Sequence, residues 1–226
     1  MRALPAFGMI PGVTVDIDGE AVVVASAGLL SVVSSAVHRG GLVSARAIIN
    51  LRVPAGETCA DPGGTLAAFA GRRGVAEPYV GLLTGTPTER AAVGEEVAHG
   101  VSAAAVVTVG LSNRVASGED PAAVWRPSTI NIIAVVDADP EPAALVNAVI
   151  TATEVKALAL GRARILGPDG GAVSGTSTDA VVIAATGRGP RVRFGGPVSE
   201  LGWAVARAVQ VALARGIADW QARNQP

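Results

Sequence analysis

The chain has 226 residues, of which half are hydrophobic and only 16% are charged. This composition excludes an intrinsically disordered chain, and the length predicts one domain spanning residues 1–226. A net charge of −1 and an aromatic content of 3% exclude the basic footprint and the base-stacking platform of nucleic-acid-binding proteins. The one cysteine, Cys59, cannot form an internal disulfide, which fits a reducing cytoplasm.

The mean hydropathy of +0.44 raises the question of a membrane. The most apolar stretch, 21–37, contains several serines and a glycine and is shorter than the roughly 20 residues of a spanning helix. We therefore expect buried strands there, or a strand and a short helix, and no membrane span. The N-terminal residues also lack the apolar core of a signal peptide.

Short β-branched segments bounded by Gly or Pro predict strands at 13–17, 21–25, 45–53, 79–84, 104–109, 130–136 and 180–185. Three helices are expected: one from an Asp61 N-cap to Gly74, one from Pro142 to about Arg162, and one from a Ser199 N-cap to about Arg223. These elements predict an α/β or α+β layered domain, with a mixed sheet and long packed helices. The order of the strands cannot be derived from the sequence.

The predicted helix 142–162 carries the most informative polar residues. It is apolar nearly all round, which predicts a buried helix, so Glu154 is expected to be a buried carboxylate with a partner or a raised pKa. Lys156, the only lysine in the chain, lies about 200° further around the helix and cannot pair locally with Glu154. A buried network that only fixes packing is an equally good reading of this pattern.

The segment from Ser174 to Asp179 places hydroxyls, a glycine and a carboxylate directly before a predicted strand. Such a turn can offer N–H groups and hydroxyls to an oxyanion, and Asp179 can orient a partner or act as a base. An ordinary self-bonded Ser/Thr/Asp turn is the competing interpretation.

Asparagines in or next to apolar segments form a second group of candidates. Asn50, Asn113 and Asn131 must find hydrogen-bond partners if buried, and each could donate to a substrate. Caps or strand-end bonds would explain them equally well. Ser35 and His38 invite comparison with a serine triad, but their spacing does not place a base against a nucleophile, and no G-x-S-x-G elbow is present. Cys59 has no cationic surroundings that favour a thiolate and is expected to be structural.

Taken together and in order, several segments resemble the adenosylcobinamide amidohydrolase family of corrinoid salvage. The resemblance runs from about Ser34 to Val209 and rests on SSAVHRGG, IINLRVP, GLLTGTP, VVTVGLSN, TINII, ATEVKALAL, GTSTDAVVIA and VSELGWAVARAV. Compared with the family pattern, Val155 stands for alanine, Ser177 for glycine and Ser128 for glycine, while Arg39 and Arg114 replace asparagine and a small residue. These changes bear on substrate fit more than on activity.

The resemblance implies hydrolysis of the amide that joins a corrin side chain to aminopropanol, giving adenosylcobyric acid and 1-amino-2-propanol. No cofactor or metal is expected to be required, since the substrate carries its own cobalt. The expected partner is this corrinoid, and the apolar composition is compatible with a homo-oligomer. A non-catalytic corrinoid-binding protein, or an amidase for another small amide, are the alternatives.

Two mechanisms remain open at this stage. In the first, Glu154 or Asp179 activates water and Lys156 holds a carboxylate ionised or binds the substrate, with oxyanion donors from the 175–178 loop and an asparagine. In the second, Thr176 or Thr178 attacks the amide, with self-cleavage at Gly175–Thr176 as one variant. The expected substrate-binding residues are Ser35, Gly40, Gly41, Asn50, Asn113, Asn131, Gly175 and Ser177.

Overall fold

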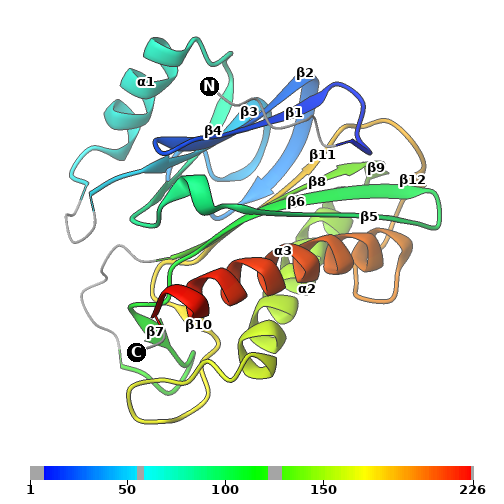
Figure 1. Cartoon of the computed structure of the whole chain (residues 1–226). Coiled ribbons are helices and arrows are strands. Elements are labelled where there is room, and N and C mark those ends of the chain that lie inside the picture. The colour runs from blue at the N-terminus through cyan, green and yellow to red at the C-terminus, as the bar shows by residue number, and fades with distance from the viewer. Residues whose placement is uncertain (1–7, 55–58, 122–128, 225–226) are drawn as a thin grey trace.

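The computed structural model describes residues 8–54, 59–121 and 129–224. Its main sheet has the order β4–β3–β2–β11–β8–β6–β5, with β1 paired to β2 beside this path (Figure 1). These strands are β1 (Val13–Ile17), β2 (Ala21–Ser34), β3 (Gly41–Arg52), β4 (Tyr79–Thr84), β5 (Ala92–Ala98), β6 (Val101–Val109), β8 (Ile130–Asp137) and β11 (Ala180–Ala185). Two small sheets pair β7 (Arg114–Val115) with β10 (Gly175–Thr176) and β9 (Asp139–Pro140) with β12 (Arg191–Val192).

The helices are α1 (Pro62–Arg73), α2 (Pro142–Arg162) and α3 (Glu200–Asn224), with a short 3₁₀ turn η1 (Thr88–Arg90). All three predicted helices are confirmed. Asp61 caps α1 by accepting a hydrogen bond from the Gly64 N–H, and Gly74 ends it in the left-handed conformation. Ser199 accepts from the Gly202 N–H at the start of α3.

The elements stack in four layers: α1, the β1–β4 part of the sheet, the β11–β8–β6–β5 part, and the pair α2 and α3 (Figure 1). Successive residues of a single strand pack on opposite sides of the sheet, as this layered arrangement requires. In β8, Ile132 and Ala134 face the core under α2 and α3, whereas Ile133 and Val135 face the core between the two parts of the sheet. Strands buried on both faces explain why their sequences are apolar throughout.

The predicted mixed α/β architecture is confirmed, with two differences in the strands. Residues 21–34 form one long strand rather than two elements. Its pairing with β3 shifts between Ala25 and Leu30, and beyond that shift β2 exchanges β1 for β11 as its neighbour. β5 was missed because Gly94, Glu95 and Glu96 break the apolar pattern. Gly94 is needed there, because a Cβ would meet the backbone of α3 near Ala208.

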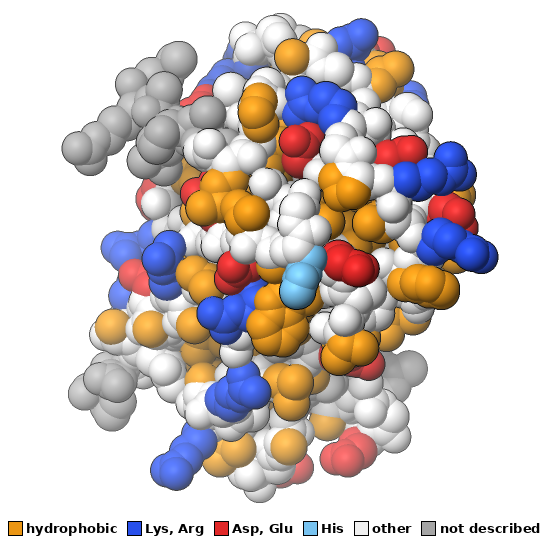
Figure 2. All heavy atoms as spheres, turned by 90° about the vertical axis from the view of Figure 1, so that its right-hand side faces the viewer, with side chains coloured by type: hydrophobic (Ala, Val, Ile, Leu, Met, Phe, Trp, Pro, Cys, Tyr) orange, Lys and Arg blue, Asp and Glu red, His pale blue; other side chains and the backbone are white. Residues whose placement is uncertain are grey.

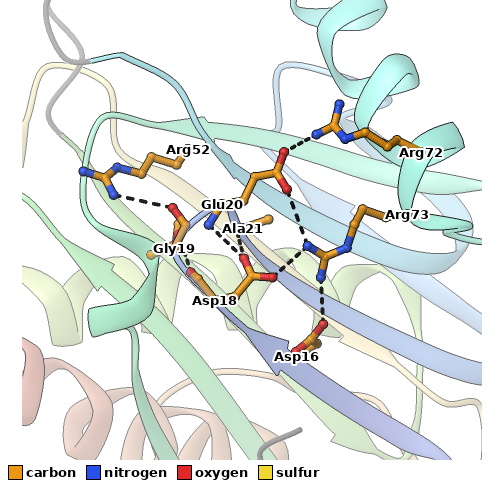
Figure 3. Close-up of polar contacts among 9 residues, drawn as sticks. Asp16, Asp18, Gly19, Glu20, Ala21, Arg52, Arg72 and Arg73 are labelled. Atoms are coloured by element: carbon orange, nitrogen blue, oxygen red, sulfur yellow. Dashed lines mark hydrogen bonds and ion pairs between the residues drawn. The ribbon is translucent and has the colours of Figure 1, made fainter. Parts of the chain in front are cut away.

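The turn of the β1–β2 hairpin is fixed to α1 by charges (Figure 3). Arg73 contacts Asp18 at 2.7 Å and Asp16 at 3.0 Å, and Arg72 pairs with Glu20. Burial alone would raise the pKa of Asp18, but hydrogen bonds from the Ala21 N–H, Arg73 and the Glu20 N–H outweigh burial and lower it. The hydrogen bond to Asp18 correspondingly raises the pKa of Arg73.

Among the described residues, α2 is the one helix that is long and apolar enough, by length and composition, to cross a membrane. The same properties are found in the core helices of globular domains. One face of α2, with Leu145, Ala148 and Ala152, packs in the core beneath α3 and the sheet. Figure 2 shows the side of the molecule that lies at the right in Figure 1. On this surface apolar, acidic and basic side chains are mixed.

Candidate active site

A cavity of about 300 Å³ opens at one end of the two sheet layers. It lies beside the ends of β2 and β4, the beginnings of β8 and β11, and the beginning of α1. Its wall consists of Ser35, Val37, Cys59, Pro62, Leu82, Leu83, Asn131, Ser177, Thr178, Asp179 and Ala180. The structure therefore brings hydroxyls, a carboxylate and an amide from three distant segments to one apolar-walled hollow, which is the usual form of a small-molecule site.

Asp179 is the centre of the polar groups behind this wall. Its Oδ1 accepts from the Ile130 N–H at 2.9 Å and from the Thr176 hydroxyl at 2.5 Å. Its Oδ2 accepts from the Thr176 N–H at 3.0 Å and from the Lys156 ammonium. A carboxylate has about four acceptor positions, so the four donors occupy all of them. Asp179 thus has no free lone pair for a water, but it already accepts a hydrogen bond from the Thr176 hydroxyl.

Lys156 reaches Asp179 from α2, on the side of the helix that faces the sheet. Both side chains are only 9% exposed, so the ion pair is largely removed from water. Each charge then compensates the cost of burying the other. Lys156 was expected to hold a carboxylate ionised or to bind the substrate. It pairs with the carboxylate of Asp179, 23 positions further along the chain.

Glu154 is a correction to the sequence analysis. It was expected to be buried, but it is exposed on the outer face of α2, and it does not line the cavity. Asn147 is likewise exposed, and only Thr151 of that polar stripe is buried, donating to the Gly195 carbonyl at 3.0 Å. The error arose because the apolar residues of α2 cover an exposed face as well as a buried one: Val146, Ile150 and Leu158 are more than half exposed.

The ion pair requires a residue without a side chain at position 175. A Cβ at this position would lie 2.6 Å from the Lys156 ammonium and would overlap Asp179 Oδ2. No side chain fits without displacing one of the two charges. Gly175 was expected to bind substrate; the structure places it behind the wall, where its lack of a side chain admits Lys156.

Two of the predicted asparagines form a buried network rather than facing the cavity with free donors. Asn131 Nδ2 donates to Asn50 Oδ1 at 2.8 Å and to the Leu83 carbonyl at 3.0 Å, which uses both of its hydrogens. Asn50 donates to Thr108 Oγ1 at 3.0 Å. The Thr129 hydroxyl lies within hydrogen-bond distance of both Asn131 Oδ1 and the Thr178 carbonyl. The network therefore joins β3, β4, β6 and β8 to the 175–179 loop.

Thr108 and Thr129 were not singled out from the sequence. Thr108 lies opposite Asn131 in the β6–β8 register, so only the strand pairing reveals it. Thr129 directly precedes β8. Its sequence position, a hydroxyl close to Asn131 in an apolar segment, could have marked it as a candidate.

Of the remaining residues predicted to bind substrate, two line the cavity and three do not. The Asn113 amide donates to Ser177 Oγ at 2.7 Å, and Ser35 Oγ accepts from the Val181 N–H at 3.1 Å. Both serines line the cavity. Gly40 and Gly41 lie in the exposed turn between β2 and β3 and are not part of the cavity wall.

His38 and Cys59 take no part in a triad with the serines. The His38 ring stacks on Tyr79 with 5.3 Å between centroids, and within the described residues it makes no hydrogen bond to Ser34 or Ser35. Cys59 Sγ lies 3.4 Å from Thr65 Oγ1, on the cavity wall. No group of three or more His, Cys, Asp or Glu side chains suited to a metal ion occurs in the described part of the chain.

The fold is similar to that of solved structures with low sequence identity. A β-aminopeptidase from Burkholderia sp. is 16% identical and has a TM-score of 0.50, with 92% of this chain and 84% of that chain covered. Two further structures cover 92% of this chain and 83% of their own. They are a protein from Pyrococcus horikoshii OT3 (12% identity, TM-score 0.47) and the L-aminopeptidase D-Ala-esterase/amidase from Ochrobactrum anthropi (11%, 0.42).

The family model described as adenosylcobinamide amidohydrolase (CbiZ) matches residues 9–225. The chain therefore belongs to the adenosylcobinamide amidohydrolase family, and the resemblance carried by its motifs is confirmed. No curated protein matches the chain.

Proposed function

We propose that the cavity beside Asp179 is where this amidohydrolase cleaves the amide between the corrin side chain and aminopropanol. The family match over residues 9–225 gives the reaction, and the Thr176–Asp179–Lys156 arrangement supports the position of the site. A cavity of about 300 Å³ accommodates a side chain of the substrate but not a corrin ring, so the ring would rest on the rim.

The observation that carries the mechanism is the hydrogen bond from Thr176 Oγ1 to Asp179 Oδ1. A nucleophile bonded to a base, with the base oriented by a third group, is the general form of an activated hydroxyl. Here the Ile130 N–H and Lys156 orient the carboxylate. Thr176 is 7% exposed and lies behind the cavity wall, beside Asp179, so the proposal requires the substrate amide to reach the Asp179 end of the cavity. Activated water, the first of the two mechanisms, is less well supported because Asp179 has no free acceptor position and Glu154 is exposed on the far side of α2.

The proposed reaction has two stages. Thr176 Oγ1 attacks the amide carbon while its proton passes to Asp179. The C–N bond then breaks and that proton goes to the departing amine, leaving a cobyric ester on Thr176. Water next attacks the ester, its proton passes by way of Asp179 back to Thr176 Oγ1, and the free acid is released. The hydroxyls of Ser177 and Thr178, which line the cavity, are the proposed donors to the oxyanion.

The reaction is tested by incubating the purified chain with adenosylcobinamide and following both products by mass spectrometry. We expect adenosylcobyric acid and 1-amino-2-propanol in equal amounts. Tight corrinoid binding without conversion would instead indicate a non-catalytic binding protein. Conversion of other small amides, but not of corrinoids, would indicate an amidase with a changed substrate.

The ester intermediate is tested by rapid mixing. If acylation is faster than deacylation, aminopropanol appears in a burst close to the enzyme concentration, before cobyric acid. Because Asp179 serves as the base, no free Thr176 amine is needed, and the purified chain should keep its mass of 22.5 kDa. Fragments from cleavage at Gly175–Thr176 would favour the self-cleaving variant of the threonine mechanism.

The cellular setting belongs to the same proposal. The product acid can re-enter cobalamin synthesis, so the reaction would serve corrinoid salvage. We place it in the cytoplasm, because the sequence has a single cysteine and therefore gains nothing from an oxidising compartment. No metal or cofactor is proposed besides the cobalt that the substrate carries.

A further inference from the structure

The outer side of α2 exposes a row of side chains at intervals of four residues, which winds gradually around the helix. Val146 and Ile150 are each 51% exposed and Leu158 is 57% exposed, and Glu154 and Arg162 are exposed between and beyond them. A spacing of four residues places them on one ridge of the helix, which we call the α2 ridge. Glu154 and Leu158 lie about 160° around the helix from Lys156, so this part of the ridge is separate from the active site.

A long groove runs beside the α2 ridge, between α2 and α3. It has a volume of about 540 Å³, and most of its wall is apolar. Leu158 and Arg162 form part of its α2 side, and Trp203, which is 45% exposed, forms part of its α3 side. A ridge of side chains next to a groove is the kind of surface on which a second helix packs.

The charges on the ridge indicate which helix that is. Glu154 and Arg162 make no hydrogen bond or ion pair with the described residues, and they lie four positions before and four positions after Leu158. When two copies of one helix pack antiparallel across a two-fold axis at Leu158, residues equally far before and after it face each other. Glu154 of each copy then faces the partner's Arg162, and the pair occurs twice.

We propose that the α2 ridge and its groove are the interface of a homodimer, with its two-fold axis at Leu158. Leu158 and Trp203 provide the apolar centre, and the two Glu154–Arg162 pairs fix the antiparallel direction. A parallel arrangement in register would place like charges together, which is unfavourable. The exposure of Leu158 and Trp203 is then explained by association between copies.

Sedimentation velocity over a range of concentrations tests this interface. We expect the full chain to sediment as a species of twice 22.5 kDa. Glu154→Arg should raise the dimer dissociation constant by about tenfold or more, since attraction becomes repulsion at two places, and Arg162→Glu should do the same. The double variant Glu154→Arg/Arg162→Glu restores both pairs in reverse and should return to within about threefold of the wild type.

The matched control is Glu119→Arg, an equal charge change at an exposed residue outside α2 and α3, which should leave the dissociation constant unchanged. Circular dichroism confirms that each variant is folded. A wild-type chain that stays monomeric, single reversals without effect, or a double variant as weak as the single ones would each overturn the proposal.

Discussion

Lys156 and Asp179 form a buried ion pair between α2 and the loop that leads into β11, with each side chain 9% exposed. The pair connects the helical layer to the wall of the cavity. The carboxylate in turn holds the Ile130 N–H and both polar groups of Thr176. One charge pair therefore positions the start of β8, the 175–179 loop and the proposed nucleophile.

Removing the charge of Lys156 should destabilise the protein strongly. Lys156→Met leaves a buried carboxylate without its cation, and the expected loss in unfolding free energy is about 3–5 kcal/mol. The double variant Lys156→Met/Asp179→Asn removes both charges and should recover a large part of this loss, while turnover stays absent. Urea unfolding measures the first effect and product formation the second. A double variant less stable than Lys156→Met would contradict the pairing.

Gly175→Ala tests the space that the ion pair requires. The new methyl group would collide with Asp179 and Lys156, so we expect a loss of about 1–3 kcal/mol in stability together with most of the activity. Gly71→Ala is the matched control. Gly71 lies within α1, where an added Cβ meets nothing within 4 Å, so alanine should stabilise the helix by about 0.5–1 kcal/mol. Equal effects of the two changes would argue against the steric explanation.

Glu154→Gln decides between the sequence-based role of Glu154 and its place in the structure. A general base typically contributes about 100- to 10,000-fold to the rate, so its loss would be unmistakable. Because Glu154 is exposed on the outer face of α2, we expect turnover of adenosylcobinamide to stay within about twofold of the wild type. A fall of a hundredfold in a folded variant would return Glu154 to the reaction.

The charges around Arg73 make stability depend on pH at the acidic end. The pKa of Asp18 lies below its ordinary value of 3.8 in the folded chain, so the folded state releases this proton more readily than the unfolded one. The stabilisation is present above pH 3.8 and is lost as the pH falls through the folded-state pKa. Asp18→Asn should therefore weaken the dependence of stability on pH below about 4. Urea unfolding between pH 5 and 3, compared with wild type, measures this, and an unchanged dependence would contradict it.

The sequence predicted the parts of the fold that local patterns control. Apolar β-branched segments correctly marked β1, β4 and β11, and caps marked α1 and α3. The change of neighbours along β2 and the existence of β5 depend on contacts between distant segments. Gly94 shows this well, because a glycine that weakens the strand pattern is the residue that lets α3 approach.

The candidate site was predicted in its residues more than in its geometry. Lys156, Thr176 and Asp179 were singled out, but their pairing required the packing of α2 against the loop before β11. The two asparagines of the network were expected to bind a substrate, yet Asn131 uses both hydrogens of its amide within the protein and Asn50 donates to Thr108. Composition alone also cannot distinguish a helix buried on all faces from one with an exposed apolar ridge, which is why Glu154 was misplaced.

The central claim is that Thr176 attacks the amide with Asp179 as its base, and the rate of adenosylcobinamide hydrolysis by Thr176→Val tests it most directly. We expect a loss of at least about a thousandfold in a folded protein, whereas Thr176→Ser, which keeps a hydroxyl, should remain active. Thr178→Val, in the same loop, should lose only about a hundredfold, because Thr178 is one of two proposed oxyanion donors and not the nucleophile. Hydrolysis by Thr176→Val at a rate near that of the wild type would contradict the account and return the attack to water.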